Sequence, residues 1–197
     1  MSKALIVNLY AGPGSLKSTI AAGVFTLLKL HGVDCELPFE FPKDLVWEEN
    51  LSMLKDQHYV FGVQSHRIWR IRNKVDVVLV DSPMLFSIVY RPETLGLEFI
   101  NDVVTTYKKY NNLDIFLKRN MDIKYIENGR EQNFKEAIEV DNKVLKVLDT
   151  YGTPYLTMNV GFNTINEIAE LILTRLKLKL RYEVNELPRR INYGSKK

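Results

Sequence analysis

Hydrophobic positions follow two spacings that alternate along this chain. Continuous apolar runs are typical of buried strands, whereas apolar residues that recur every three or four positions are typical of amphipathic helices. The runs predict strands over 4–10, 33–37, 75–80, 113–117 and 154–158. The periodic stretches predict helices over 17–31, 96–110, 132–150 and 164–176, with helical character throughout 43–72. This alternation predicts a three-layer α/β fold with a five-stranded parallel sheet flanked by helices.

Local signals predict where several of the helices begin and end. Gly32 follows the stretch 17–31 and Gly152 follows the stretch 132–150, and glycine commonly stops a helix at such positions. The segment from Thr164 to Glu167 has the spacing of a capping box, which predicts the start of the last helix.

The first strand leads into a glycine-rich turn and then directly into the first helix. This order predicts a phosphate-binding loop, in which backbone N–H groups and the positive end of the new helix face phosphate oxygens. We expect Lys17 to reach the β- and γ-phosphates of ATP and the Ser18 hydroxyl to bind Mg²⁺. The predicted nucleotide-binding residues are Gly12, Pro13, Gly14, Ser15, Leu16, Lys17, Ser18 and Thr19.

This loop departs from the usual pattern G-x-x-x-x-G-K-[ST] at two positions. Ala11 stands at the first glycine and Leu16 at the second. Glycine serves where a loop needs a positive φ, and leucine there carries a steric penalty. Two interpretations follow: a loop that binds nucleotide despite Leu16, or a degenerate loop that binds weakly or not at all.

Three further positions carry polar side chains where apolar ones are expected. Asp81 follows the most apolar strand, at the edge where open α/β sheets bind ligands. It is similar to a Walker B aspartate that holds Mg²⁺. Alternatively, it only caps the next turn. Gln64 and Arg67 lie on the apolar stripe of 57–72, so they either point into a substrate cleft or lie at the stripe's edge in water. Asp141 lies on the buried stripe of its helix, which requires a partner.

Composition narrows the class of protein only slightly. Hydrophobic residues make up 46% and charged residues 26% of 197, which is ordinary for a soluble domain, and the net charge of +3 gives no bulk argument for nucleic acid. The single cysteine, Cys35, predicts a reducing compartment. No apolar run approaches membrane-spanning length, so we expect a cytoplasmic protein without membrane association. Basic residues are concentrated near the end, with 181–197 as a basic tail, which is either solvated or binds a phosphate-rich partner.

Taken in order, these motifs resemble those of P-loop kinases of the nucleoside and nucleotide kinase type. More closely, they resemble small phage-encoded proteins labelled AAA-family ATPases or kinases, which implies a host cytoplasm. The blocks that carry the resemblance are the loop 12–19, Lys43–Glu48, Asp81–Pro83 and Phe116–Arg119. The resemblance implies a single kinase-like domain over 1–180, with a lid at about 119–131.

The resemblance also implies roles for particular residues. In such kinases lid arginines neutralise charge on the transferring phosphoryl group, which implies this role for Arg119 and Arg130. Asp141 could orient one of these arginines. Alternatively, both arginines are solvated loop residues. In deoxynucleoside kinases a carboxylate after the second strand accepts the proton of the substrate hydroxyl, and Glu40 occupies that location, although it could also be an exposed turn residue.

The sequence therefore predicts an ATP- and Mg²⁺-dependent kinase that acts on a nucleoside, a nucleotide or an acceptor linked to DNA. Its predicted catalytic residues are Lys17, Glu40, Asp81, Arg119 and Arg130, its substrate residues Glu40, Gln64 and Arg67, and its metal ligands Ser18 and Asp81. The alternative is a regulator or ATPase that binds nucleotide through a degenerate loop and transfers no phosphoryl group.

Overall fold

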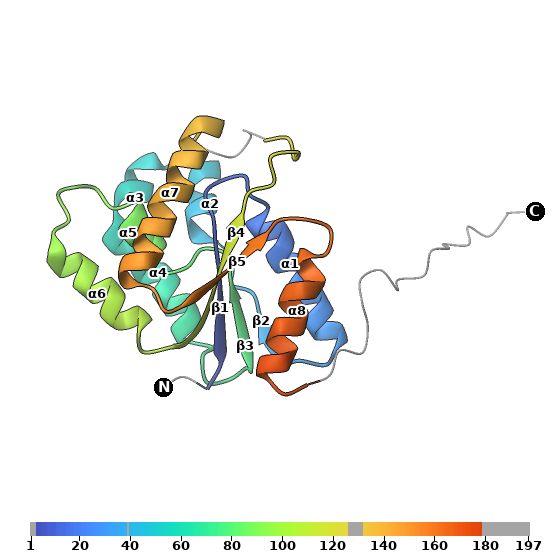
Figure 1. Cartoon of the computed structure of the whole chain (residues 1–197). Helices are drawn as coiled ribbons and strands as arrows, with labels where there is room; N and C mark the ends of the chain where they lie inside the picture. The colour runs from blue at the N-terminus through green and yellow to red at the C-terminus, as the bar shows by residue number, and fades with distance from the viewer. Residues whose placement is uncertain (1–2, 39, 126–131, 179–197) are drawn as a thin grey trace, which may run out of the picture.

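The computed structural model describes residues 3–38, 40–125 and 132–178, and a parallel sheet lies at its centre. Strand β1 is in the middle of the sheet and is flanked by β3 and β4, while β2 and β5 lie at the edges (Figure 1). All four neighbouring pairs are parallel. The sheet confirms the predicted five-stranded fold, with strands β1 (Leu5–Tyr10), β2 (Cys35–Glu36), β3 (Val77–Val80), β4 (Asn111–Lys118) and β5 (Tyr155–Asn159).

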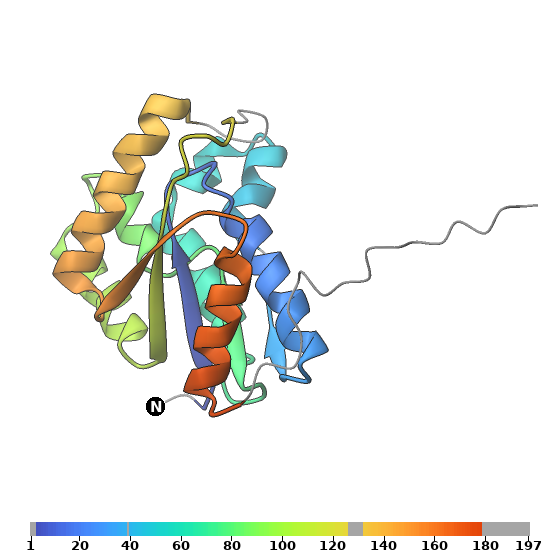
Figure 2. The same ribbon diagram turned by 45° about the vertical axis from the view of Figure 1, so that its right-hand side comes forward.

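Helices cover both faces of this sheet (Figures 1 and 2). On one face lie α1 (Lys17–Leu30) and α8 (Thr164–Arg175). On the other lie α4 (Gln57–Trp69), α5 (Phe86–Val89), α6 (Leu97–Tyr107) and α7 (Phe134–Tyr151). Two short helices, α2 (Phe41–Trp47) and α3 (Leu51–Lys55), lie beyond the carboxyl end of β1, at the top of Figure 1.

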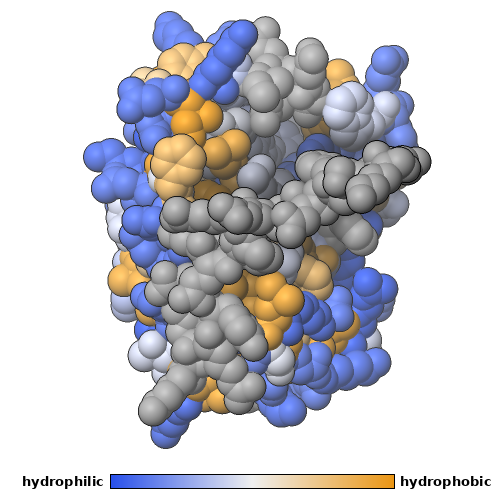
Figure 3. All heavy atoms as spheres, turned by 90° about the vertical axis from the view of Figure 1, so that its right-hand side faces the viewer, coloured by the Kyte–Doolittle hydropathy of each residue, from blue (hydrophilic) through white to orange (hydrophobic). Residues whose placement is uncertain are grey.

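Strand β3 shows why a continuous apolar run predicts a buried parallel strand. Val77 and Leu79 pack into the core beneath α1 and α8, whereas Val78 and Val80 pack into the core beneath α4 to α7. Both faces of the strand are therefore withdrawn from water. The α1 and α8 face, as far as Figure 3 shows it, is largely hydrophilic with small separate hydrophobic groups, because these helices turn their apolar stripes toward the sheet.

The segment with helical character over 43–72 is three helices rather than one. Glu49 has a left-handed backbone with φ of 55°, and this conformation ends α2. The Asn50 side chain then accepts a hydrogen bond from the N–H of Met53, and the Asp56 side chain accepts one from Tyr59. Such side chains compete with the helix for backbone donors, so each begins a new helix.

The predicted capping box at Thr164 is wrong. The Thr164 hydroxyl accepts from the N–H of Gly161 at 2.8 Å and donates to the carbonyl of Asn159 at 3.1 Å, so it closes the preceding turn instead. A capping box does occur at α7, between Asn133 and Glu136. Gly32 and Gly152 follow α1 and α7 as predicted.

A buried carboxylate joins β4 to its neighbours. Asp114 is 0% exposed and accepts hydrogen bonds from Asn8 on β1 at 2.8 Å, from the Thr153 hydroxyl at 2.8 Å and from the Tyr107 hydroxyl. Burial, and then the charge of Asp114, raise the pKa of Tyr107 well above its usual value. The carboxylate is therefore satisfied by three donors from three different segments.

Replacing Asp114 with alanine is expected to lower the free energy of unfolding by about 3 kcal/mol, because two buried donors and one part-buried donor lose their acceptor together. Urea unfolding followed by circular dichroism measures the change. Asp102→Ala on the exposed side of α6 is the matched control and should change stability by less than about 0.5 kcal/mol. A loss of similar size in both variants would contradict the assigned role of Asp114.

Candidate functional site

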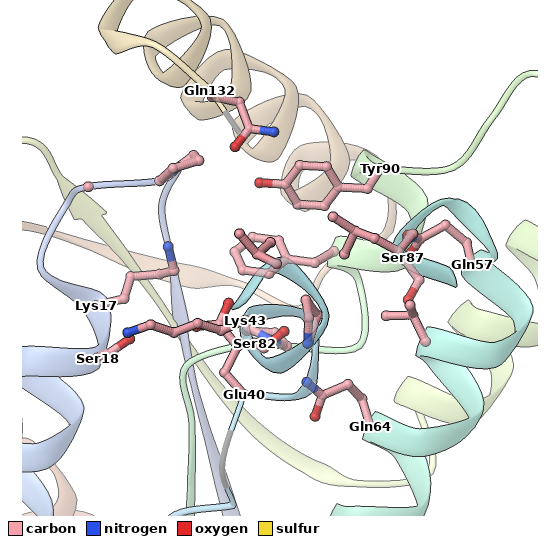
Figure 4. Close-up of a pocket in the computed structure, with 18 of the residues that line it drawn as sticks. Lys17, Ser18, Glu40, Lys43, Gln57, Gln64, Ser82, Ser87, Tyr90 and Gln132 are labelled. Atoms are coloured by element: carbon pink, nitrogen blue, oxygen red, sulfur yellow. The ribbon is translucent and has the colours of Figure 1, made fainter. Parts of the chain in front are cut away.

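A cavity of about 340 Å³ opens at the carboxyl ends of the strands, where the predicted phosphate-binding loop, called the phosphate loop below, follows β1. The first turn of α1 forms one wall through Lys17, Ser18 and Thr19. Glu40, which precedes α2, and Gln64 on α4 lie across from that turn (Figure 4). The cavity therefore brings together three segments that are far apart in the sequence.

The backbone of the loop requires glycine-like conformations at two positions. Gly14 has φ of 72° and Leu16 has φ of 65° with ψ of 17°, both in the left-handed region. Leu16 stands where the usual loop pattern has its second glycine, so the loop keeps a left-handed backbone there without glycine. A left-handed non-glycine residue costs roughly 1–2 kcal/mol.

Hydrogen bonds within the loop hold its first residue. The Ser15 hydroxyl and the Lys17 ammonium both donate to the carbonyl oxygen of Gly12, at 2.8 Å and 3.1 Å. Within the described residues, no side chain caps the start of α1 and no acidic residue lies in its first turn. The positive end of the helix is thus free to attract an anion in the cavity.

Burial shifts the pKa of the two charged groups that face each other here. Burial lowers the pKa of Lys17, and the nearby carboxylates Glu40, Asp81 and Asp141 act in the opposite direction. Burial raises the pKa of Glu40, and the charge of Lys17 acts against this shift. Perturbed titratable groups that share a cavity are typical of functional sites.

Positive charge predominates among the described residues that line the cavity. Lys17, Lys43 and Lys55 supply three ammonium groups, whereas Glu40 is the one carboxylate. Figure 4 shows the Lys43 side chain extended toward Ser18. An anionic ligand such as a polyphosphate suits this lining.

Ser18 and Asp81 are the residues that fit Mg²⁺. Ser18 lines the cavity, whereas Asp81 is buried and is not among the lining residues; it follows β3 directly before Ser82, which does line the cavity. No group of three His, Cys, Asp or Glu residues in the described part of the chain could hold a metal. One hydroxyl and one carboxylate nevertheless suit Mg²⁺, which usually keeps several waters and takes its other ligands from phosphates.

The wall opposite the phosphate loop combines amides with apolar side chains. Gln57, Val60 and Gln64 project from one face of α4, and Gln64 is only 5% exposed. The Gln64 amide nitrogen is buried and has no hydrogen-bond partner among the described residues. An unpaired buried donor is costly unless a ligand satisfies it. Apolar contact for a planar ligand comes from Pro42, Val46, Trp47, Leu54, Pro83 and Phe86.

Not every predicted site residue faces the cavity. Arg67 is not among the lining residues; its guanidinium lies 3.9 Å from Asp44 and over the ring of Phe41. Gly12 and Ser15 belong to the loop but do not line the cavity either. Arg119 is turned toward Asp141, at 3.0 Å, and Arg130 lies outside the described residues. The lid at about 119–131 is described only as far as residue 125, and the basic tail lies outside the described residues.

Sequence reasoning missed several lining residues. Gln57 precedes Gln64 by two helical turns, so the same periodicity that singled out Gln64 could have found it. Lys43, Trp47 and Ser82 lie in blocks that carry the family resemblance, but the sequence did not assign them to the site. Lys55, Ser87, Tyr90 and Gln132 carry no such signal, because they come from short helices and turns that only the fold brings together.

A substitution at Leu16 tests the loop backbone. Leu16→Val is expected to destabilise the fold by about 1–2 kcal/mol, because β-branched residues tolerate a positive φ poorly. Leu16→Gly should stay within about 1 kcal/mol of the parent, since relief of strain offsets lost side-chain packing. Thermal unfolding of the two variants measures the difference. Equal stability of the valine and glycine variants would contradict a left-handed residue here.

A comparison with solved structures identifies the class of fold. Among 150 matching chains is the NadR protein in complex with NR, with a TM-score of 0.72 and 12% sequence identity. The match covers 91% of this chain and 54% of that one, so this chain spans about half the length of its neighbour. A scan against protein-family models and a search of curated proteins gave no match.

The structural match supports the three-layer α/β fold with a five-stranded parallel sheet, as the sequence predicts. At this level of identity the similarity shows the fold alone. The resemblance to small phage-encoded ATPases stays a prediction. No helix in the described part of the chain is long and apolar enough to cross a bilayer.

Proposed function

We propose that this chain is an ATP-dependent kinase that transfers the γ-phosphoryl group to a hydroxyl of a small nucleoside or nucleotide acceptor. The observation that carries the proposal is one cavity that joins the first turn of α1 to a wall containing Glu40 and Gln64. The part of the cavity beside the first turn of α1 suits a polyphosphate. The part beside Glu40 and Gln64 suits a neutral planar group that carries a hydroxyl. The likeness to NadR, solved with NR, supports a kinase-like function at the same coarse level.

In this proposal the phosphate loop and α1 bind ATP. Lys17 contacts the β- and γ-phosphates, and Ser18 and Asp81 hold Mg²⁺, directly or through its waters. Mg²⁺ held there would supply positive charge against the phosphate oxygens. Catalysis then consists mostly of positioning and charge stabilisation.

On the acceptor side, Glu40 accepts the proton of the attacking hydroxyl. Its raised pKa brings it closer to the operating pH, where a general base is most efficient. The amide nitrogen of Gln64 donates to a carbonyl or ring nitrogen of the acceptor, which satisfies a donor that is otherwise unpaired. If the acceptor offered a charged phosphate instead of a hydroxyl, the Glu40 carboxylate would repel it. This favours a hydroxyl as the group that accepts the phosphoryl group from ATP.

A nucleotide-binding regulator or ATPase without transfer activity is the second candidate. The left-handed backbone of Leu16 favours it, because a strained loop can bind nucleotide without aligning it for transfer. An acceptor linked to DNA also stays a prediction, since most of the basic residues that motivate it lie beyond residue 178.

Radiolabel transfer from γ-labelled ATP with Mg²⁺ tests the proposal. Each candidate acceptor is offered as the free nucleoside and as its monophosphate. Labelled product from a nucleoside supports a hydroxyl acceptor. Stabilisation by Mg·ATP in a thermal-shift assay, with no labelled product from any acceptor, favours the regulator. If Mg·ATP neither stabilises the protein nor yields labelled product, the chain does not bind nucleotide and both candidate functions fail.

Gln64→Leu is expected to raise KM for the acceptor by about 10-fold or more, because the volume is kept while the donor is removed. KM for ATP should stay within about 2-fold of the parent value. Initial rates with each substrate varied in turn measure both constants. Ser65→Ala, on the neighbouring position of α4 and outside the cavity lining, is the control. Equal changes in the two KM values would argue against a role in acceptor binding.

A further inference from the structure

Three consecutive residues of the phosphate loop are each contacted by a side chain from outside the loop. The Gly12 N–H donates to Asp141 on α7, and the carbonyl of Pro13 accepts from Arg119 Nη2 at 2.7 Å. The ring of Tyr125 lies against Gly14, where an added Cβ would come within 2.3 Å of it. We call Arg119, Tyr125 and Asp141 the loop brace.

The two charged members of the loop brace are paired and buried. Arg119 Nε donates to Asp141 Oδ2 at 3.0 Å, and the two side chains are 7% and 13% exposed. The Arg119 guanidinium also lies over the rings of Tyr125 and Phe134, at 5.9 Å and 6.0 Å. Each charge is thus fixed by the other, and removing one would leave a buried charge without its partner.

Close packing keeps α7 and the loop together. A Cβ at Gly12 would lie 2.5 Å from the carbonyl oxygen of Ala137 and 2.8 Å from Asp141 Oδ1. Glycine at this position is therefore explained by the approach of α7 rather than by its φ angle. The same approach brings the Asp141 carboxylate within reach of the Gly12 N–H.

We propose that Arg119 and Asp141 are positioning residues that hold Gly12–Gly14 in its phosphate-binding shape, and that Arg119 does not contact the transferring phosphoryl group. Two of the Arg119 donors are committed to Asp141 and Pro13, and Arg119 is not among the residues that line the cavity. The loop needs such support because Leu16 strains it, and strained backbone persists only where its surroundings hold it. The inference rests on the proposed function, since it assigns roles at the same site.

Three variants test the loop brace: Arg119→Met, Asp141→Asn and the double variant. Two readouts test the brace directly: the Kd for a fluorescent ADP analogue with Mg²⁺, and hydrogen exchange of the Gly12 amide. The kcat of phosphoryl transfer is measured beside them. Arg119→Met should raise the Kd by at least about 10-fold and accelerate exchange at Gly12, because Asp141 is left as an unpaired buried charge. Adding Asp141→Asn should restore part of both losses, about 3-fold or more, since an amide oxygen still accepts from Gly12 without a buried charge.

The exposed pair of Lys29 and Glu36, 3.9 Å apart, supplies the matched control. Lys29→Met, Glu36→Gln and their combination should change both readouts by less than about 2-fold. The proposal is overturned if Arg119→Met lowers kcat while the Kd and the Gly12 exchange rate stay unchanged. It is also overturned if adding Asp141→Asn to Arg119→Met raises the Kd and the Gly12 exchange rate further. Hydrogen exchange needs no nucleotide. If the parent chain binds no ADP analogue, the proposed function fails while the exchange result still decides the loop brace.

Discussion

Replacing Lys17 with methionine is expected to reduce phosphoryl transfer by about 1000-fold. Its ammonium is one of three that line the cavity, and it belongs to the first turn of α1, where an anion is attracted by the helix as well. Removing one preorganised donor to a developing charge typically costs about 100-fold to 1000-fold in kcat. Methionine keeps the unbranched shape of the side chain up to the position of Cε, so the loss reports the missing ammonium group.

Steady-state transfer from labelled ATP measures this effect, with circular dichroism as a check on folding. Lys29→Met at the far end of α1 is the matched control, because it makes the same substitution on the same helix away from the cavity. It should retain at least about half of the parent rate. A Lys17→Met protein that turns over ATP at the parent rate would remove the basis for a kinase.

Much of the fold could be predicted because its signals are local. The run from Val77 to Val80 is apolar without interruption, and only a strand covered on both faces buries all of it. Gly32 and Gly152 are local signals as well, because each stands directly after the end of a helix. The breaks at Glu49 and Asp56 were missed, because they depend on a left-handed residue and on side-chain caps that no glycine or proline announces.

The candidate site was predictable only where a motif carries its own backbone context. The loop 12–19 could be assigned from sequence, and its leucine was singled out as an exception. The resemblance implies that Asp141 orients a lid arginine, and the structure pairs Asp141 with Arg119. The sequence could not predict that this pairing leaves Arg119 outside the cavity lining, because that depends on how α7 packs against the loop. Arg67 shares an apolar stripe with Gln64, yet a one-turn offset directs it to Asp44 instead of the cavity.

Glu40→Gln is expected to lower kcat by about 100-fold to 10,000-fold while leaving KM for ATP within about 2-fold of the parent. The proposed role of Glu40 is to accept the hydroxyl proton, and losing a general base typically costs this much. Glu48→Gln at the exposed end of α2 is the control and should retain the parent rate. In the parent enzyme the rate should rise with pH through a step that lies above the usual glutamate pKa, because burial raises the pKa of Glu40.

The same raised pKa predicts that Glu40→Gln stabilises the fold. A carboxyl whose pKa is higher in the folded than in the unfolded state binds more protons when folded, so its contribution to stability falls as the pH rises from about 4.3 through the folded value. Above that window the parent carries the cost of a charged, half-buried carboxylate, and glutamine does not. Thermal unfolding at pH 4 and pH 8 should therefore show Glu40→Gln gaining stability relative to the parent at the higher pH. If the variant loses activity and also loses stability at pH 8, Glu40 supports the fold rather than the reaction; a gain in stability paired with a loss of activity is what a functional carboxylate produces.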